Sequence, residues 1–120
     1  MGLLSRQAIL LADDLKREPV DVPEWGGTVL IAAMTGAQRD AWEQSLVARG
    51  GQGAARINID NVRARLVAYC AVDEDGKRLF ADADAAMLGE KSGAALERCA
   101  KVAQRLNGLT EQAMEDARGN

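Results

Sequence analysis

The side chains that most often perform enzyme chemistry are sparse in this chain, and histidine is absent. Histidine is the residue most often used as a general base and as a zinc ligand near neutral pH. Serine or cysteine catalysis would need a different base, and no lysine stands in a motif that places it beside a serine or a cysteine. The sequence therefore predicts a protein that is not an enzyme and that holds no cofactor or metal.

Two segments have the composition of a ligand-binding loop but the wrong spacing. In residues 73–84 the glycine, Gly76, stands fourth rather than sixth, and Asp84 occupies the twelfth position, where a calcium loop has glutamate. Residues 51–56 lack the third glycine of a dinucleotide-binding loop and follow a predicted helix rather than a strand. We interpret the first segment as a hairpin turn with an acidic rim and the second as a flexible loop.

The two cysteines, Cys70 and Cys99, lie far apart in the sequence among apolar or small neighbours. This setting favours two buried free thiols in a reducing compartment over a disulfide.

Charge and hydropathy argue against nucleic acid and membranes as partners. Eighteen acidic residues against fifteen basic ones give a net charge of -3, which disfavours non-specific attraction to phosphate groups. The longest apolar run, residues 28–37, is about half of the ~20 residues that a membrane helix needs, and residues 1–6 show no targeting signal. A basic segment remains, which we interpret as a solvated face able to meet an acidic protein surface: Arg49, Arg56, Arg63 and Arg65.

The N-terminal half predicts a helix followed by a β-hairpin. Ser5 can cap a helix of about ten residues that carries Ala8, Leu11 and Leu15 on one face and ends before Pro19. Val20 and Val22 then alternate with polar residues and prolines, and a glycine-rich turn leads into the β-branched run 28–31. Because proline cannot donate a ladder hydrogen bond, we expect the strand 18–22 to be an exposed edge, on which a second copy could pair.

The middle of the chain predicts two helices separated by a loop. Thr35 and Gln38 have the spacing of a capping box, and the helix they open places Trp42 on its core side. Residues 49–57 are rich in glycine and predict a flexible loop. Residues 58–61 can begin the next helix.

The last third predicts a second tight hairpin and three helical segments. Asp75 and Gly76 form a turn signal between the apolar pairs 71–72 and 79–80. A short helix follows over residues 82–88, a long amphipathic helix runs from Ser92 to Asn107, and a final piece starts at Thr110. The predicted fold class is α+β: a single domain over residues 1–120, mainly helical with about five helices and two hairpins.

One of the two tryptophans, Trp25, lies in the predicted turn of the first hairpin. Either it folds back over Val20, Val22 or Leu30 and adds to the core, which is the simpler interpretation, or it is exposed as an anchor for a partner. The candidate partner-binding residues are Trp25, Leu30, Arg63 and Arg65.

The order of these segments resembles the tail assembly chaperone family of long-tailed bacteriophages and prophages. Each motif is weak alone, since it consists of turns, caps and helix faces, but their order along nearly the whole chain is specific. The segments that carry the resemblance are LLADDL at 10–15, VDVPEWGG at 20–27, MTGAQRDAWE at 34–43, NVRARLV at 61–67, DEDGKRLF at 73–80, LGEKS at 88–92 and RLNGL at 105–109.

The resemblance implies a non-enzymatic protein that binds the tape measure protein, keeps it soluble and helps recruit tail tube subunits. It also implies action in the cytoplasm of the bacterial host and absence from the mature virion, with a homo-oligomer as a further possibility. A small structural tail or head-completion protein shares the size, the acidity and the lack of an active site, and is the alternative.

Overall fold

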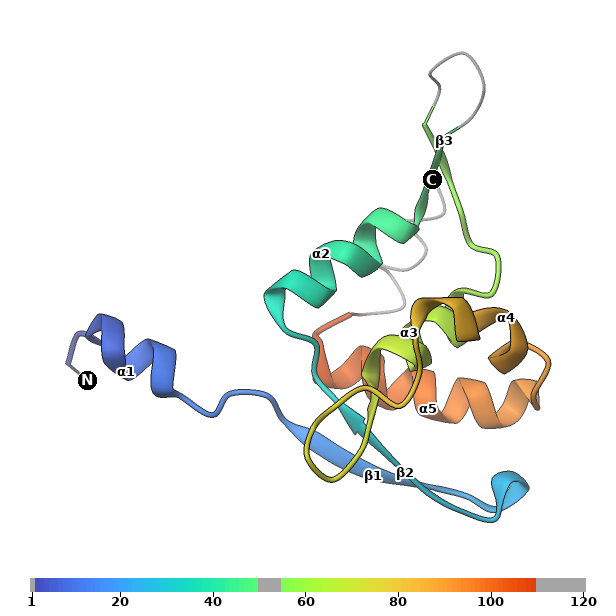
Figure 1. The fold of residues 1–120 in the computed structure, drawn as a ribbon, viewed down its shortest axis with the longest axis horizontal. Helices are drawn as coiled ribbons and strands as arrows, with labels where there is room; N and C mark the ends of the chain where they lie inside the picture. Colours follow the sequence, from blue (N-terminus) through green and yellow to red (C-terminus); the bar gives the residue numbers. More distant parts are fainter. Residues whose placement is uncertain (1, 50–54, 110–120) are drawn as a thin grey trace.

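The computed structural model describes residues 2–49 and 55–109 of the 120-residue chain (Figure 1). Within these residues the fold is α+β, as predicted, with five α-helices and two small antiparallel sheets. The helices are α1 (Arg6–Leu11), α2 (Gly36–Ser45), α3 (Val62–Cys70), α4 (Ala85–Leu88) and α5 (Gly93–Leu106). The strands are β1 (Arg17–Val22), β2 (Gly27–Ala32), β3 (Val47–Arg49), β4 (Ala55–Ile57) and β5 (Ala71–Val72), and the 3-10 turns are η1 (Pro23–Trp25) and η3 (Asp82–Asp84).

A three-stranded sheet with the order β1-β2-β5 forms one layer, and α3 and α5 cover one of its faces. The first hairpin is confirmed: β1 pairs with β2 from Arg17 opposite Ala32 to Val22 opposite Gly27. β1 forms an edge of this sheet, as the prolines predicted. Because side chains alternate along a strand, Val20, Val22 and Ile31 reach the helices and join the core.

Local sequence explains where two of the helices begin. The predicted capping box is confirmed at α2, where the Thr35 hydroxyl accepts a hydrogen bond from the Gln38 N–H and the Gln38 side chain accepts one from the Thr35 N–H. At α5 the Ser92 hydroxyl accepts from the Ala95 N–H. Both caps satisfy backbone donors that the first helical turn leaves unpaired.

The core lies between the sheet, α3 and α5, and it is closed by α2. Trp42 of α2 is 1% exposed, which confirms it as a core residue. Cys70 and Cys99 are buried free thiols, as predicted. The Asn107 side chain accepts from the Met34 N–H and donates to the Ala103 carbonyl, so it joins the end of α5 to the chain that leaves β2.

Two sequence-based predictions need correction, and they concern the lengths of a helix and a loop. The first helix ends at Leu11 rather than near Leu15, since Ala12 is already extended and no residue of α1 is buried. The loop predicted over residues 49–57 is wrong at its ends, because Arg49 closes β3, and β4 pairs with β3 in register. Residues 50–54 lie outside the described residues, as does the helix predicted from Thr110.

The second hairpin is confirmed as a short one: Val72 and Arg78 form an antiparallel bridge, the Asp73 N–H donates to the Lys77 carbonyl, and the Leu79 N–H donates to the Ala71 carbonyl. Gly76 has the positive φ (84°) that the turn signal predicted, and the other edge of β5 pairs with β2. Arg78 turns inward after this turn, where its Nε donates to the Ala68 carbonyl and its guanidinium lies 4.3 Å from the centre of the Tyr69 ring.

Candidate interaction surfaces

The four candidate partner-binding residues do not form one surface. Trp25 lies in η1 at the tip of the first hairpin, where it is half-buried and packs against the core. Leu30 pairs with Pro19 and Val72, so it lies on the sheet face opposite the one that carries Ile31 and that α3 and α5 cover. Trp25 at the hairpin tip and Leu30 on the outer face of the sheet therefore belong to different surfaces.

The hairpin tip is tied to α5 by an ion pair. Both guanidinium nitrogens of Arg98 donate to the two carboxylate oxygens of Glu24, at 2.9 and 3.0 Å. This two-fold hydrogen bond lowers the pKa of Glu24 from 4.5 to about 2. The pair holds η1, and with it Trp25, over α5.

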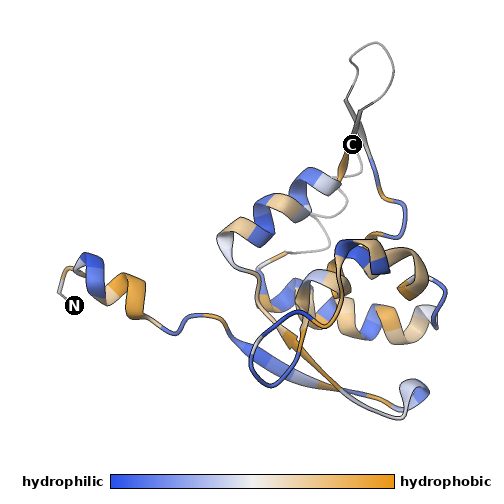
Figure 2. Ribbon diagram, in the orientation of Figure 1, coloured by the Kyte–Doolittle hydropathy of each residue, from blue (hydrophilic) through white to orange (hydrophobic). Residues whose placement is uncertain are grey.

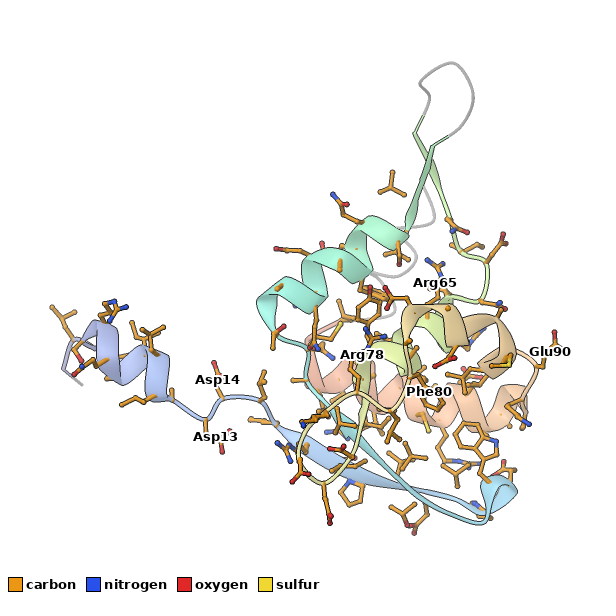
Figure 3. The ribbon with its side chains drawn as sticks, viewed as in Figure 1. Asp13, Asp14, Arg65, Arg78, Phe80 and Glu90 are labelled. Carbon is orange, nitrogen blue, oxygen red and sulfur yellow. The ribbon has the colours of Figure 1, made fainter. Side chains whose placement is uncertain are left out.

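The two arginines near the start of α3 point to different surroundings. Arg63 is exposed beside a hollow between the N-terminal ends of α3 and α5. Arg65 is half-buried, and its guanidinium donates to the backbone carbonyls of Ser45, Asn58 and Asp60. Its cationic head is therefore used to hold the end of α2 against the segment that leads into α3 (Figure 3).

Burial disfavours the reactive thiolate form of both cysteines. Burial raises the pKa of Cys70 to about 12 and also raises the pKa of Cys99. Since the thiolate is the reactive form, both side chains stay protonated and act as small apolar core residues. Over residues 2–49 and 55–109, no group of three or more acidic or cysteine side chains is placed to hold a metal ion.

The largest concentration of exposed apolar side chains lies in the segment before β1, here called the N-terminal arm (residues 2–16). Figure 1 shows α1 standing apart from the rest of the molecule, and Figure 2 shows the apolar character of its second half. Leu11 is 83% exposed and Leu10 is 64% exposed, and Leu3 is fully exposed. The large apolar residues of the arm are Leu3, Leu4, Ile9, Leu10, Leu11 and Leu15.

A second apolar surface lies at the other end of the molecule, in a groove of about 610 Å³ beside α4, here called the α4 groove. Leu79 and Met87 are 51% and 68% exposed at its sides, while Phe80 is half-buried and Leu88 is buried. The charged residues that line the groove are Asp84, Glu90 and Lys91.

Sequence reasoning missed both surfaces as possible sites. The arm has a helical apolar pattern, which normally indicates a core-facing helix. The α4 groove combines residues from the turn after β5 and from α4, and nothing in the sequence shows that these two segments lie side by side.

No α-helix among the described residues has the length and apolar character needed to cross a membrane. The family model for phage tail assembly chaperones matches residues 5–119. The search of curated proteins gives no match. Among solved structures, the tail assembly chaperone of bacteriophage HK97 has a similar fold, with a TM-score of 0.57 at 18% sequence identity over 83% of this chain and 94% of that one.

Proposed function

The chain belongs to the phage tail assembly chaperone family, and we propose that it binds the tape measure protein, keeps it soluble and helps recruit tail tube subunits during tail morphogenesis. It does so as one domain and without catalysing a reaction. Its place of action is the cytoplasm of the bacterial host, and it leaves before the virion is complete.

The observation that carries this proposal is the amount of apolar side chain that the described residues leave in water. Six large apolar residues of the N-terminal arm and two at the sides of the α4 groove are between about a third and fully exposed. Contiguous exposed apolar surface of this kind marks protein interaction sites. A grooved apolar surface accepts the apolar stripe of an amphipathic helix, which is the kind of segment that a long helical tape measure protein presents before the tube encloses it.

The candidate partner-binding residues contribute unequally to this proposal. Arg63 is available for an acidic segment of the tape measure protein or of a tube subunit, and Leu30 offers an apolar contact on the outer face of the sheet. Trp25 and Arg65 remain proposed partner contacts, but both side chains also hold the fold together.

We also propose self-association, for which the edge of β1 was the first candidate. Pro19 provides no N–H on this edge, and Glu18 and Asp21 place charges along it. These are the devices by which proteins prevent strands from pairing edge to edge. They favour a different surface for contact between copies.

The test of the chaperone proposal is co-expression with the tape measure protein from the same phage or prophage genome. We expect the soluble fraction of the tape measure protein to rise, and the two chains to purify together. A double substitution of Leu79 and Met87 by serine should remove most of this effect, whereas Val47→Ser, a change of an exposed apolar residue outside the arm and the groove lining, should not. No gain in solubility and no complex with the unchanged chain would refute the proposal.

Purified virions separate the chaperone from a structural tail or head-completion protein. A structural subunit remains in the particle in fixed proportion, whereas a chaperone is missing from it. Detection of the chain in virions at the level of a tail component would replace the chaperone proposal with the structural one.

A further inference from the structure

We propose that the hollow between the N-terminal ends of α3 and α5 binds an acidic side chain of the tape measure protein, and that this contact selects the segment that is bound. The inference deepens the proposed function and rests on it for the identity of the partner. The hollow is here called the basic hollow. It has exposed charged side chains at its edge and buried apolar ones in its lining: Arg63, Lys91 and Glu97, and Val62, Ala64 and Leu96.

The basic hollow has a volume of about 420 Å³ and lies where two segments of the chain meet. Asn61, which precedes α3, has a positive φ of 52°, and its side chain lies against Gly89 at the end of α4. A Cβ atom at position 89 would be 2.8 Å from Asn61 Oδ1, so this close approach needs glycine. The contact holds together the segments that carry Arg63 and Lys91, each two residues further along the chain.

The two cations of the basic hollow are not neutralised by other parts of the fold. Within residues 2–49 and 55–109, neither Arg63 nor Lys91 forms an ion pair, whereas five other cations pair with carboxylates. Glu97, the acid at the edge, has its own partner, because its carboxylate lies 4.0 Å from Lys101 Nζ. The hollow is therefore positive in a chain whose net charge is -3, and it attracts anionic groups.

The basic hollow adjoins the α4 groove, since Lys91 lines both. The groove offers Phe80 and Met87 to apolar side chains, and Ile59, which is 45% exposed, adds an apolar contact at the hollow. The two surfaces together fit one segment that has an apolar stripe and an acidic residue further along.

The chemistry of the hollow favours a carboxylate over a nucleic acid. A phosphate backbone is bound by a series of cations, whereas here two cations stand beside Glu97. The planar guanidinium of Arg63 matches a carboxylate through two parallel hydrogen bonds. The buried side chains of Val62 and Leu96 suit the methylene groups of a glutamate or an apolar neighbour of the acid.

The expected role of this contact is selection of a segment more than affinity. Burial of apolar surface is non-directional, so an apolar groove alone accepts many amphipathic helices. An exposed charge pair adds little free energy, but it disfavours segments that place a cation or no charge at the same position. The acid bound by Arg63 and Lys91 therefore sets which segment binds and in which direction it lies.

The experiment measures binding of the full chain to peptides that tile the tape measure protein of the same genome, each long enough for several helical turns. We expect the tightest peptides to combine an apolar stripe with Asp or Glu. Replacing that acid by its amide should weaken binding to the unchanged chain about fivefold. The same replacement should have no effect on binding to the double variant Arg63→Met with Lys91→Met, as a double-mutant cycle requires for a direct contact.

The sign of each charge change distinguishes an acidic occupant from a basic or neutral one. Arg63→Glu and Lys91→Glu should each weaken peptide binding, whereas Glu97→Gln should strengthen it about twofold, because it removes a negative charge from the edge. Lys77→Glu is the control, since Lys77 is an exposed cation that lines neither surface, and it should bind like the unchanged chain. All four side chains are exposed, so the melting temperatures should agree.

A photo-reactive label identifies what enters the hollow. Arg63→Cys adds an exposed thiol to a chain whose Cys70 and Cys99 are buried, so the label attaches at position 63. We expect the cross-link to form with the tape measure peptide. A product joined to residues 2–16 of the same or a second copy, with the peptide present, would assign the hollow to the N-terminal arm and overturn the proposal.

Two further results would contradict the proposal. One is peptide binding that does not respond to the charges at positions 63, 91 and 97, which would leave the chaperone function intact and remove the role of the hollow. The other is binding of double-stranded DNA that the same variants abolish while peptide binding is unchanged. Failure of the chaperone function looks different: the unchanged chain binds no peptide and captures no tape measure protein, and both proposals are then refuted.

Discussion

The N-terminal arm and α5 carry similar patterns but meet opposite surroundings. Both begin with a serine whose hydroxyl caps the helix, and both place apolar residues at helical spacing. In α5 that stripe is covered by α3 and the sheet, and Cys99 and Ala103 have no exposed surface. In the arm Leu11 is 83% exposed. A helical apolar pattern thus predicts that the apolar side of a helix will be buried. It does not predict whether it is buried by the same chain or by a partner.

The contrast between packed and exposed apolar side chains predicts its largest effect, a loss of folding stability, for a substitution of Trp42. Trp42→Ala removes a side chain that is 1% exposed between α2 and the core, and we expect a loss of about 3–5 kcal/mol in the free energy of unfolding. Within residues 2–49 and 55–109 its indole Nε1 has no hydrogen-bond partner, so the expected loss is one of packing. Leu11→Ala, the matched change in the arm, should alter stability by less than about 0.5 kcal/mol.

Urea unfolding followed by circular dichroism measures both Trp42→Ala and Leu11→Ala. Because circular dichroism does not depend on tryptophan fluorescence, it remains usable when Trp42 is removed. A loss of several kcal/mol for Leu11→Ala would show that the arm packs on the body of its own copy, and the contrast would fail.

The two arginines of α3 extend the same contrast to polar residues. Arg65→Met removes donors from three backbone carbonyls and should cost about 1.5–3 kcal/mol, since the partly buried acceptors lose their partners. Arg63→Met changes an exposed side chain and should stay within about 0.5 kcal/mol.

Thermal unfolding of Arg65→Met and Arg63→Met, compared with the unchanged chain, measures this difference. Equal destabilisation by the two substitutions would contradict it. If Arg63→Met also weakens capture of the tape measure protein at unchanged stability, then Arg63 belongs to the partner surface and Arg65 to the fold.

Sequence reasoning succeeded where a signal is local. The capping box of Thr35 and Gln38, the Ser92 cap and the positive φ at Gly76 each follow from neighbouring residues, and all three were predicted correctly. The first hairpin was also local, since β1 and β2 are joined by a short turn. The core position of Trp42 followed from helical spacing alone.

Sequence reasoning failed where contacts between residues that are far apart in the sequence determine the structure. β5 pairs with β2, about forty residues earlier in the sequence, and no local pattern predicted this pairing. Arg65 looked like a surface cation because no local pattern shows that three carbonyls converge on it. The α4 groove was not predicted either, although its lining lies within residues 79–91, because no sequence pattern shows how the turn after β5 packs beside α4.

Trp25 is intermediate between the buried Trp42 and the exposed Leu11, because it is half-buried at the tip of a hairpin. We expect Trp25→Ala to cost about 1–2 kcal/mol, less than Trp42→Ala, because only part of its apolar surface is removed from water. Denaturant unfolding and a pull-down with the tape measure protein, made on the same sample, distinguish its two roles. Unchanged stability with lost capture would make Trp25 a partner anchor instead of a core residue.

The smallest effect concerns the ion pair that holds the hairpin tip, and it depends on pH. Arg98 lowers the pKa of Glu24 to about 2 in the folded protein, whereas the unfolded chain has the ordinary value of 4.5. A lowered pKa stabilises the fold above the unfolded value, and this contribution is lost as pH falls from about 4.5 to about 2. Since the Glu24 and Arg98 side chains are 34% and 42% exposed, salt should weaken the effect.

Glu24→Gln removes the titrating group, so its melting temperature should fall less steeply with acid over the same pH window than that of the unchanged chain. Asp40→Asn, which removes an exposed carboxylate that has no ion pair in the described residues, is the control and should follow the unchanged chain. Identical acid slopes for Glu24→Gln and the unchanged protein would mean that the hairpin tip, like the arm, contributes little to the stability of the body. The boundary between the packed and the unpacked parts of the molecule would then lie nearer to Val22 than to Trp25.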